Sequence, residues 1–136
     1  MTTSIHDALI HIMVVAATSD AAITDQELVR IEALVGRLPV FESFERQQLA
    51  KVVNATVDKL NAKGLDAVLD DAIKALPGKL QDTAYALAVE VTAVDLNLTQ
   101  EELRFLELMR DAMDLDRLTT AAIEVAARAR HRRLPG

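Results

Sequence analysis

The sequence contains no cysteine and no tryptophan, and it has only one tyrosine and three phenylalanines. Without cysteine, the chain has no disulfide framework, no thiolate metal site and no cysteine nucleophile. Its three histidines, His6, His11 and His131, are too scattered for the spacing of a tetrahedral zinc site. So few aromatic rings also provide no stacking platform for nucleic-acid bases. The carboxylates are therefore the first place to look for a functional site.

Long hydrophobic runs are absent as well. The longest unbroken ones, 12–17 and 84–89, are far shorter than the roughly 20 residues of a membrane-spanning helix. No secretory signal is visible at the N-terminus, so we expect a cytoplasmic location. Apolar residues still make up 51% of the 136 residues, which is too many for a disordered chain and enough for a core. We expect residues 1–136 to form one domain.

The net charge of −6 is unevenly distributed along the chain. Four of the 15 cations lie in the last nine residues, which leaves residues 1–127 with a net charge of −10. An acidic body repels nucleic acid, so we expect metal ions or basic proteins as partners. The basic end has two interpretations. Its arginines either complement the dipole at the end of a helix or form a tail that binds a partner; they are Arg128, Arg130, Arg132 and Arg133.

Proline and glycine, three and four in number, mostly fall between periodic segments. Good helix formers dominate the rest of the chain. The sequence therefore predicts an all-α fold, a compact bundle of seven helices at about residues 3–19, 25–38, 44–62, 66–76, 79–94, 100–113 and 116–132. The predicted N-terminal caps are Thr3 or Ser4, Thr24, Ser43, Thr99, and Asp114 or Asp116.

A short motif occurs twice, 75 positions apart. The first copy reads Asp20-Ala-Ala-Ile-Thr24-Asp-Gln-Glu27-Leu, and the second reads Asp95-Leu-Asn-Leu-Thr99-Gln-Glu-Glu102-Leu. Each copy follows a helix that is apolar on nearly all sides and precedes an amphipathic one. Because fully apolar helices lie at the centre of a bundle, we expect the first and fifth helices to contact each other and to be related by an approximate two-fold.

Both copies have a purely structural interpretation. Thr24 with Glu27, and Thr99 with Glu102, match the capping box, in which a threonine hydroxyl and a glutamate satisfy amides at the start of a helix. An aspartate before such a helix also serves as a turn residue that bonds to nearby backbone amides. On this interpretation the protein is a helical interaction module whose acidic motifs bind no ligand.

The motifs also have a functional interpretation. An aspartate at the end of a helix faces the negative end of the helix dipole, which is locally unfavourable. Both copies of the motif nevertheless place an aspartate there. If the two loops meet, four carboxylates converge on one point: Asp20, Glu27, Asp95 and Glu102. Such a cluster needs shifted pKa values or a cation, and oxygen ligands suit Ca²⁺, Mg²⁺ or Mn²⁺. The loops are not EF-hands, because the glycine and the bidentate glutamate of that motif are missing.

With these motifs, an all-helical chain of this length resembles the tellurite-resistance TerB family and its TerB-like relatives over roughly residues 5–130. The resemblance implies a seven-helix domain with an acidic cluster proposed to bind metal ions, linked to tellurite resistance and stress response. On the matching positions this cluster is Asp20, Glu27, Asp95 and Glu102. Ala21 and Leu96 stand where family members often carry glycine.

Other functional motifs are missing from the sequence. No Gly-x-Ser-x-Gly turn and no phosphate-binding glycine-rich loop occurs. His11 lies in an apolar segment and is interpreted as a residue of the core or its boundary. A carboxylate enzyme is the third hypothesis, but the chain is poor in the aromatic residues that such sites use. We expect a non-enzymatic protein with protein partners.

Overall fold

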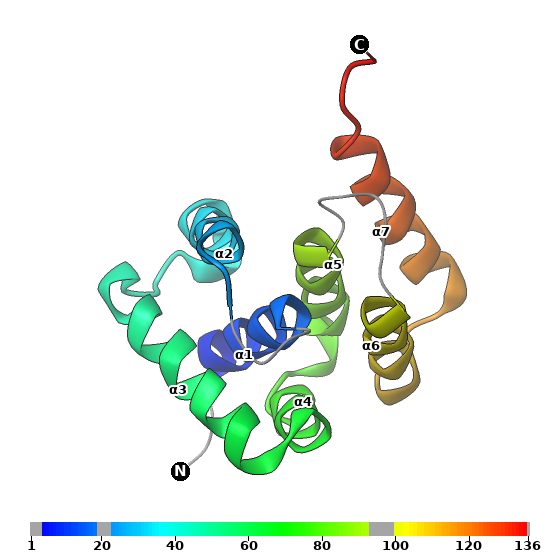
Figure 1. Cartoon of the computed structure of the whole chain (residues 1–136). Helices are drawn as coiled ribbons and strands as arrows, with labels where there is room; N and C mark the ends of the chain where they lie inside the picture. Colours follow the sequence, from blue (N-terminus) through cyan, green and yellow to red (C-terminus); the bar gives the residue numbers. More distant parts are fainter. Residues whose placement is uncertain (1–3, 19–22, 93–99, 136) are drawn as a thin grey trace.

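The computed structural model describes residues 4–18, 23–92 and 100–135. Within these ranges all regular structure is helical, which confirms the all-α prediction (Figure 1). The described ranges contain seven α-helices: α1 (Ile5–Ala17), α2 (Asp25–Arg37), α3 (Leu49–Lys63), α4 (Leu65–Lys74), α5 (Gln81–Thr92), α6 (Gln100–Ala112) and α7 (Arg117–Arg130). The same ranges contain three short 3₁₀ helices between them: η1 (Pro39–Phe41), η2 (Arg46–Gln48) and η3 (Gly78–Leu80).

Helix α1 is the centre of the bundle. All of its residues from Ala8 to Ala17 are buried, because it packs against α2, α3, α4 and α5, which surround it in Figure 1. The predicted contact between the first and fifth helices is therefore confirmed. The approximate two-fold between the two halves stays a prediction.

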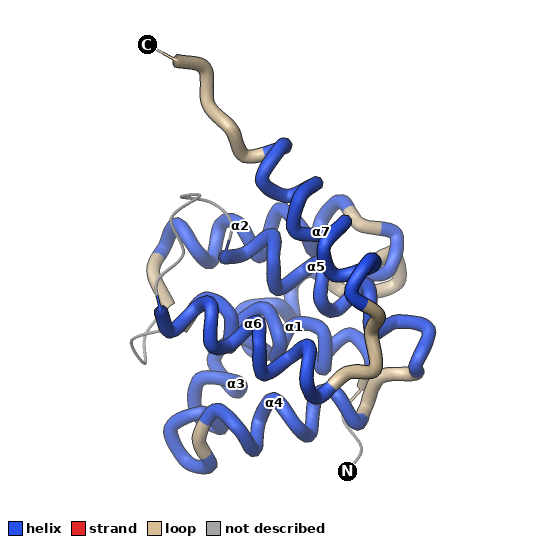
Figure 2. The backbone as a smooth tube through the Cα atoms, turned by 90° about the vertical axis from the view of Figure 1, so that its right-hand side faces the viewer, coloured by secondary structure: helices blue, strands red, loops and turns tan. Residues whose placement is uncertain are grey.

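Helix α5 connects this centre to the rest of the molecule. It packs against α1, α2, α6 and α7, and the view in Figure 2 is turned so that α6 and α7 lie toward the viewer. No α-helix in the described ranges is long and apolar enough to cross a membrane.

A partly buried polar cluster ties α5, α6 and α7 together. The hydroxyl of Tyr85 donates to Oε2 of Glu124 at 2.5 Å, and Nη1 of Arg110 donates to the Tyr85 hydroxyl at 2.8 Å and to Glu124 Oε2 at 3.1 Å. The Tyr85 side chain is fully buried. Burial and the neighbouring Glu124 carboxylate raise the pKa of Tyr85 to about 12, although Arg110 opposes the shift. One residue from each of three helices therefore shares a single hydrogen-bond network.

Three of the predicted helix caps are confirmed, those at Ser4, Thr24 and Asp116. Ser4 Oγ accepts from the Asp7 amide at 3.1 Å, and the Asp116 carboxylate accepts from the Thr119 amide at 2.7 Å. At the start of α2, Thr24 Oγ1 accepts from the Glu27 amide at 3.1 Å, while Glu27 Oε1 accepts from the Thr24 amide at 2.9 Å. The first capping box is thus confirmed. The second depends on Thr99, which lies outside the described residues.

Changing Thr24 to alanine should lower the free energy of unfolding by about 0.5–2 kcal/mol, the usual loss for a helix cap. The change removes the acceptor for the Glu27 amide and leaves Glu27 with only the backbone amide of residue 24. Urea unfolding followed by circular dichroism measures the effect. Thr24→Ser is the matched control, since serine retains the hydroxyl. An alanine variant as stable as the original protein would contradict the capping role.

The predicted start of the third helix at Ser43 is wrong. The chain forms a turn there, and α3 begins only at Leu49, after η2. A cluster of rings accounts for the difference: His6 stacks on Phe41 at a centroid distance of 5.8 Å and meets the edge of Phe44 at 5.4 Å. His6 Nε2 also donates to the carbonyl of Val40 at 2.9 Å. These contacts with α1 hold residues 42–44 in a turn that does not continue into α3.

His11 lies in the core, as its apolar surroundings in the sequence indicate. It is 5% exposed. Burial lowers its pKa, the positive charge of Lys59 adds to this, and Asp7 opposes it. In the described part of the chain no buried side-chain nitrogen or oxygen lacks a hydrogen-bond partner. His11 is therefore accommodated as a neutral residue of the core.

Candidate functional site

Of the four predicted metal ligands, the structure describes two, Glu27 and Glu102. Asp20 and Asp95 lie outside the described residues. Glu27 is in the first turn of α2, where its Oε1 accepts from both the amide and the hydroxyl of Thr24, each at 2.9 Å. Both bonds use the same oxygen, so capping engages only one of the two oxygens of the Glu27 carboxylate.

Glu102 lines a hollow of about 270 Å³ where three helices meet. Thr18, directly after α1, and Asp66, in the first turn of α4, line the same hollow. Arg104 and Phe105 of α6 line it as well. The first acidic loop leaves α1 at Thr18 and the second leads into α6. The shared hollow therefore places the end of α1, which precedes the first acidic loop, close to the start of α6, which follows the second.

The described residues do not by themselves form a metal site. Among them, no three histidine, aspartate or glutamate side chains are grouped so that they could hold an ion. Glu27 and Glu102 each contribute a carboxylate, and completing the cluster depends on Asp20 and Asp95. The convergence of all four residues stays a prediction.

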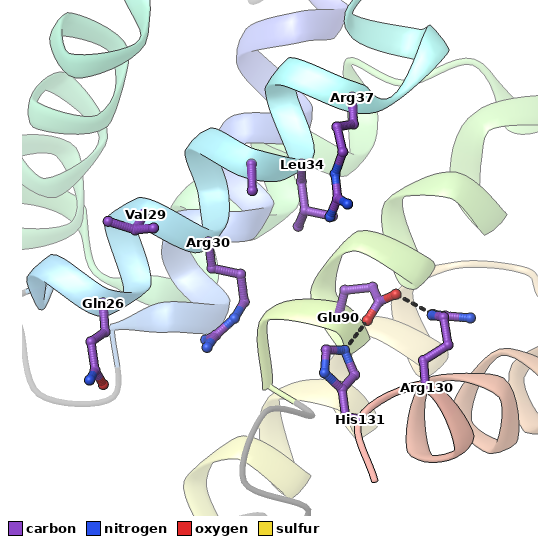
Figure 3. A pocket seen from close by; sticks show the side chains of 9 residues that line it. Gln26, Val29, Arg30, Leu34, Arg37, Glu90, Arg130 and His131 are labelled. Atoms are coloured by element: carbon purple, nitrogen blue, oxygen red, sulfur yellow. Dashed lines mark hydrogen bonds and ion pairs between the residues drawn. The ribbon is translucent and has the colours of Figure 1, made fainter. Parts of the chain in front are cut away.

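A second candidate site, which the sequence analysis missed, is a groove of about 430 Å³ between α2 and the end of α7 (Figure 3). Its walls carry four basic side chains, Arg30 and Arg37 of α2 and Arg130 and His131 at the end of α7. Glu90 of α5 is the single acidic residue of the lining. The aliphatic part of the lining consists of Val29, Ala33 and Leu34.

Glu90 is bound on both of its oxygens. Oε1 accepts from Nη2 of Arg130, and Oε2 accepts from Nε2 of His131 at 2.6 Å. The Glu90 side chain is only 18% exposed, so these contacts hold the end of α7 against α5. The basic C-terminal end of the chain thus has a third role, besides the helix dipole and a partner-binding tail: two of its residues close one wall of the groove.

Arg30 and Arg37 differ from Arg130, which pairs with Glu90. In the part of the chain that the structure describes, no carboxylate pairs with either of them. They are seven residues apart on α2, which places them on the same face of the helix, roughly 10 Å apart along its axis. In Figure 3 both side chains extend from α2 toward the opposite wall of the groove, where Glu90 and Arg130 lie. The seven-residue spacing of the two arginines can be read from the sequence. The residues that form the opposite wall of the groove cannot.

Comparisons with family models, curated proteins and solved structures found no match for this chain. The resemblance to the TerB family accordingly rests on the paired motifs, and a functional proposal must rest on the chemistry of the two sites.

Proposed function

We propose that this protein is a non-enzymatic, TerB-like helical domain that binds a divalent cation through its two acidic loops and acts in the response to metal stress or tellurite. The proposed ligands are Asp20, Glu27, Asp95 and Glu102. The observation that carries the proposal is the shared hollow of Thr18 and Glu102, because it supports the meeting of the two loops at one end of the bundle.

The donor set favours a hard cation. Carboxylate oxygens suit Ca²⁺, Mg²⁺ and Mn²⁺, and the absence of cysteine from the sequence leaves no thiolate to favour softer metals. Glu27 uses one carboxylate oxygen for its helix cap, so its second oxygen is the proposed donor. Capping would then also orient the ligand, since the Glu27 carboxylate is already fixed by Thr24.

The alternative is an interaction module whose acidic motifs serve only as helix caps. Two observations favour it. The capping box at Thr24 accounts for the threonine and the glutamate of the first motif without any ligand. In addition, Leu118 and Val125 lie seven residues apart on α7 and are 81% and 55% exposed, so α7 offers apolar side chains to a protein partner.

Thermal or urea unfolding with Ca²⁺, Mg²⁺ and Mn²⁺ separates these two functions. A bound cation at about ten times its dissociation constant should stabilise the fold by about 1.4 kcal/mol through mass action. Changing both Asp20 and Asp95 to asparagine should abolish this gain, because asparagine retains the turn chemistry of aspartate but removes its charge.

The matched control changes Asp58 and Asp111 to asparagine, since both are exposed on helices and give the same change in net charge. This control should retain the full response to the cation. If no cation stabilises the unmodified protein, or if both double variants lose the response equally, the metal site is wrong and the interaction module is the better function.

A further inference from the structure

The groove between α2 and the end of α7 has the opposite charge to the protein as a whole. The chain carries a net charge of −6, whereas the groove is lined by Arg30, Arg37 and Arg130 against the single carboxylate of Glu90. Arg130 already pairs with that carboxylate. The unbalanced positive charge therefore belongs to Arg30 and Arg37.

The fold itself gives no structural reason for both of these arginines. Arg37 lies in the last turn of α2, where a cation complements the helix dipole. Arg30 lies in the middle of the same helix, outside the range of that effect. It is only partly exposed, and it has no ion-pair partner among the described residues.

We propose that this groove binds a small multivalent anion, with phosphate or carboxylate groups held by the guanidinium groups of Arg30 and Arg37. Guanidinium forms two parallel hydrogen bonds with either kind of group. The spacing of the two arginines, roughly 10 Å along α2, suits a ligand that carries more than one anionic group. Free simple anions such as chloride fit only one arginine at a time.

The dimensions of the groove favour a small molecule over a protein segment. Its volume of about 430 Å³ falls within the range of about 300–1,000 Å³ that is typical of small-molecule sites. Val29, Ala33 and Leu34 provide an apolar surface between the charged groups. Glu90 does not block an anion, because both of its oxygens are already bound by Arg130 and His131.

Isothermal titration calorimetry of the full chain with pyrophosphate and with citrate tests the proposal, at constant ionic strength set by sodium chloride. We expect one molecule of at least one of these anions to bind per chain. Arg30→Gln with Arg37→Gln should weaken that binding by about tenfold or more, since two charge-assisted contacts are lost. Comparing pyrophosphate with citrate shows whether phosphate or carboxylate is preferred.

Arg132→Gln with Arg133→Gln is the matched control. Both residues are exposed beyond the end of α7 and line no part of the groove, yet their replacement changes the net charge by the same amount. This control should bind the anion with unchanged affinity. Equal weakening in both variants would show a non-specific charge effect and overturn the proposal. So would an absence of binding of both pyrophosphate and citrate at millimolar concentrations.

The anion site and the proposed cation site can be tested separately. The Arg30 and Arg37 variant should retain any stabilisation by divalent cations, and the Asp20 and Asp95 variant should still bind the anion. A circular-dichroism spectrum and a melting curve of each variant confirm that the helices are intact.

Discussion

Replacing Leu9 by alanine should lower the free energy of unfolding by about 2–5 kcal/mol. Leu9 is fully buried in α1, and α1 is enclosed by α2, α3, α4 and α5. Removing three carbon atoms at this point leaves a cavity between helices that are held by many other contacts, so the surroundings collapse only in part. Urea denaturation with an unchanged m-value measures the loss.

Leu118→Ala is the matched control for this prediction. It removes the same atoms from a leucine on α7 that is 81% exposed, so its effect should stay within about 0.5 kcal/mol. Since domains of this size are stable by only about 5–15 kcal/mol, the Leu9 variant should unfold at clearly lower urea concentrations. Similar losses at both positions would mean that α1 is not the centre of the core.

The sequence predicts the helices well because their signals are local. Apolar residues of the first helix occupy every side of it, and this alone places α1 at the centre of the bundle. Gly64 ends α3 close to the predicted boundary at residue 62, and its φ of +88° is a conformation that glycine adopts without strain. The start of α3 was wrong because the cause is not local. Phe41 and Phe44 contact His6 of α1, and no pattern within residues 40–48 reveals that contact.

The acidic site and the basic groove also differ in whether their signals are local in the sequence. The acidic motifs are contiguous strings, so the sequence identifies them and the helix cap at Thr24. The cap at Thr99 and ligation by Asp20 and Asp95 stay predictions. The basic groove combines residues of α2, of α5 and of the end of α7 that are up to about a hundred positions apart: Arg30, Glu90 and His131. Only the packing of α2 and α7 on α5 brings them together, so their spacing in the sequence carries no signal of a site.

The Tyr85 cluster is another long-range feature, and it predicts a loss of stability at alkaline pH. The pKa of Tyr85 is raised to about 12 in the folded protein, mainly by burial, whereas an unfolded tyrosine has a pKa of about 10. The folded state thus holds the phenolic proton more tightly than the unfolded state does. The stabilisation is complete below pH 10 and is lost as the pH rises from about 10 to 12.

The size of this loss follows from the two pKa values. A difference of about two units corresponds to an energy on the order of 3 kcal/mol, which should appear as a decline in the free energy of unfolding across that range. The chain has one tyrosine and no tryptophan, so the absorbance of tyrosinate reports Tyr85 alone. Its titration in the folded protein should have a midpoint well above 10.

Tyr85→Phe isolates this contribution from the other groups that titrate at alkaline pH. Phenylalanine fills nearly the same volume but carries no proton to lose, so this variant should decline less between pH 10 and 12. At pH 7 it should lose about 1.5–3 kcal/mol, the net worth of a hydrogen bond to a charged group, because the Tyr85 hydroxyl bonds to both Glu124 and Arg110, which still contact each other in the variant. A tyrosinate midpoint near 10 in the folded protein would contradict the burial of Tyr85 in the network between α5, α6 and α7.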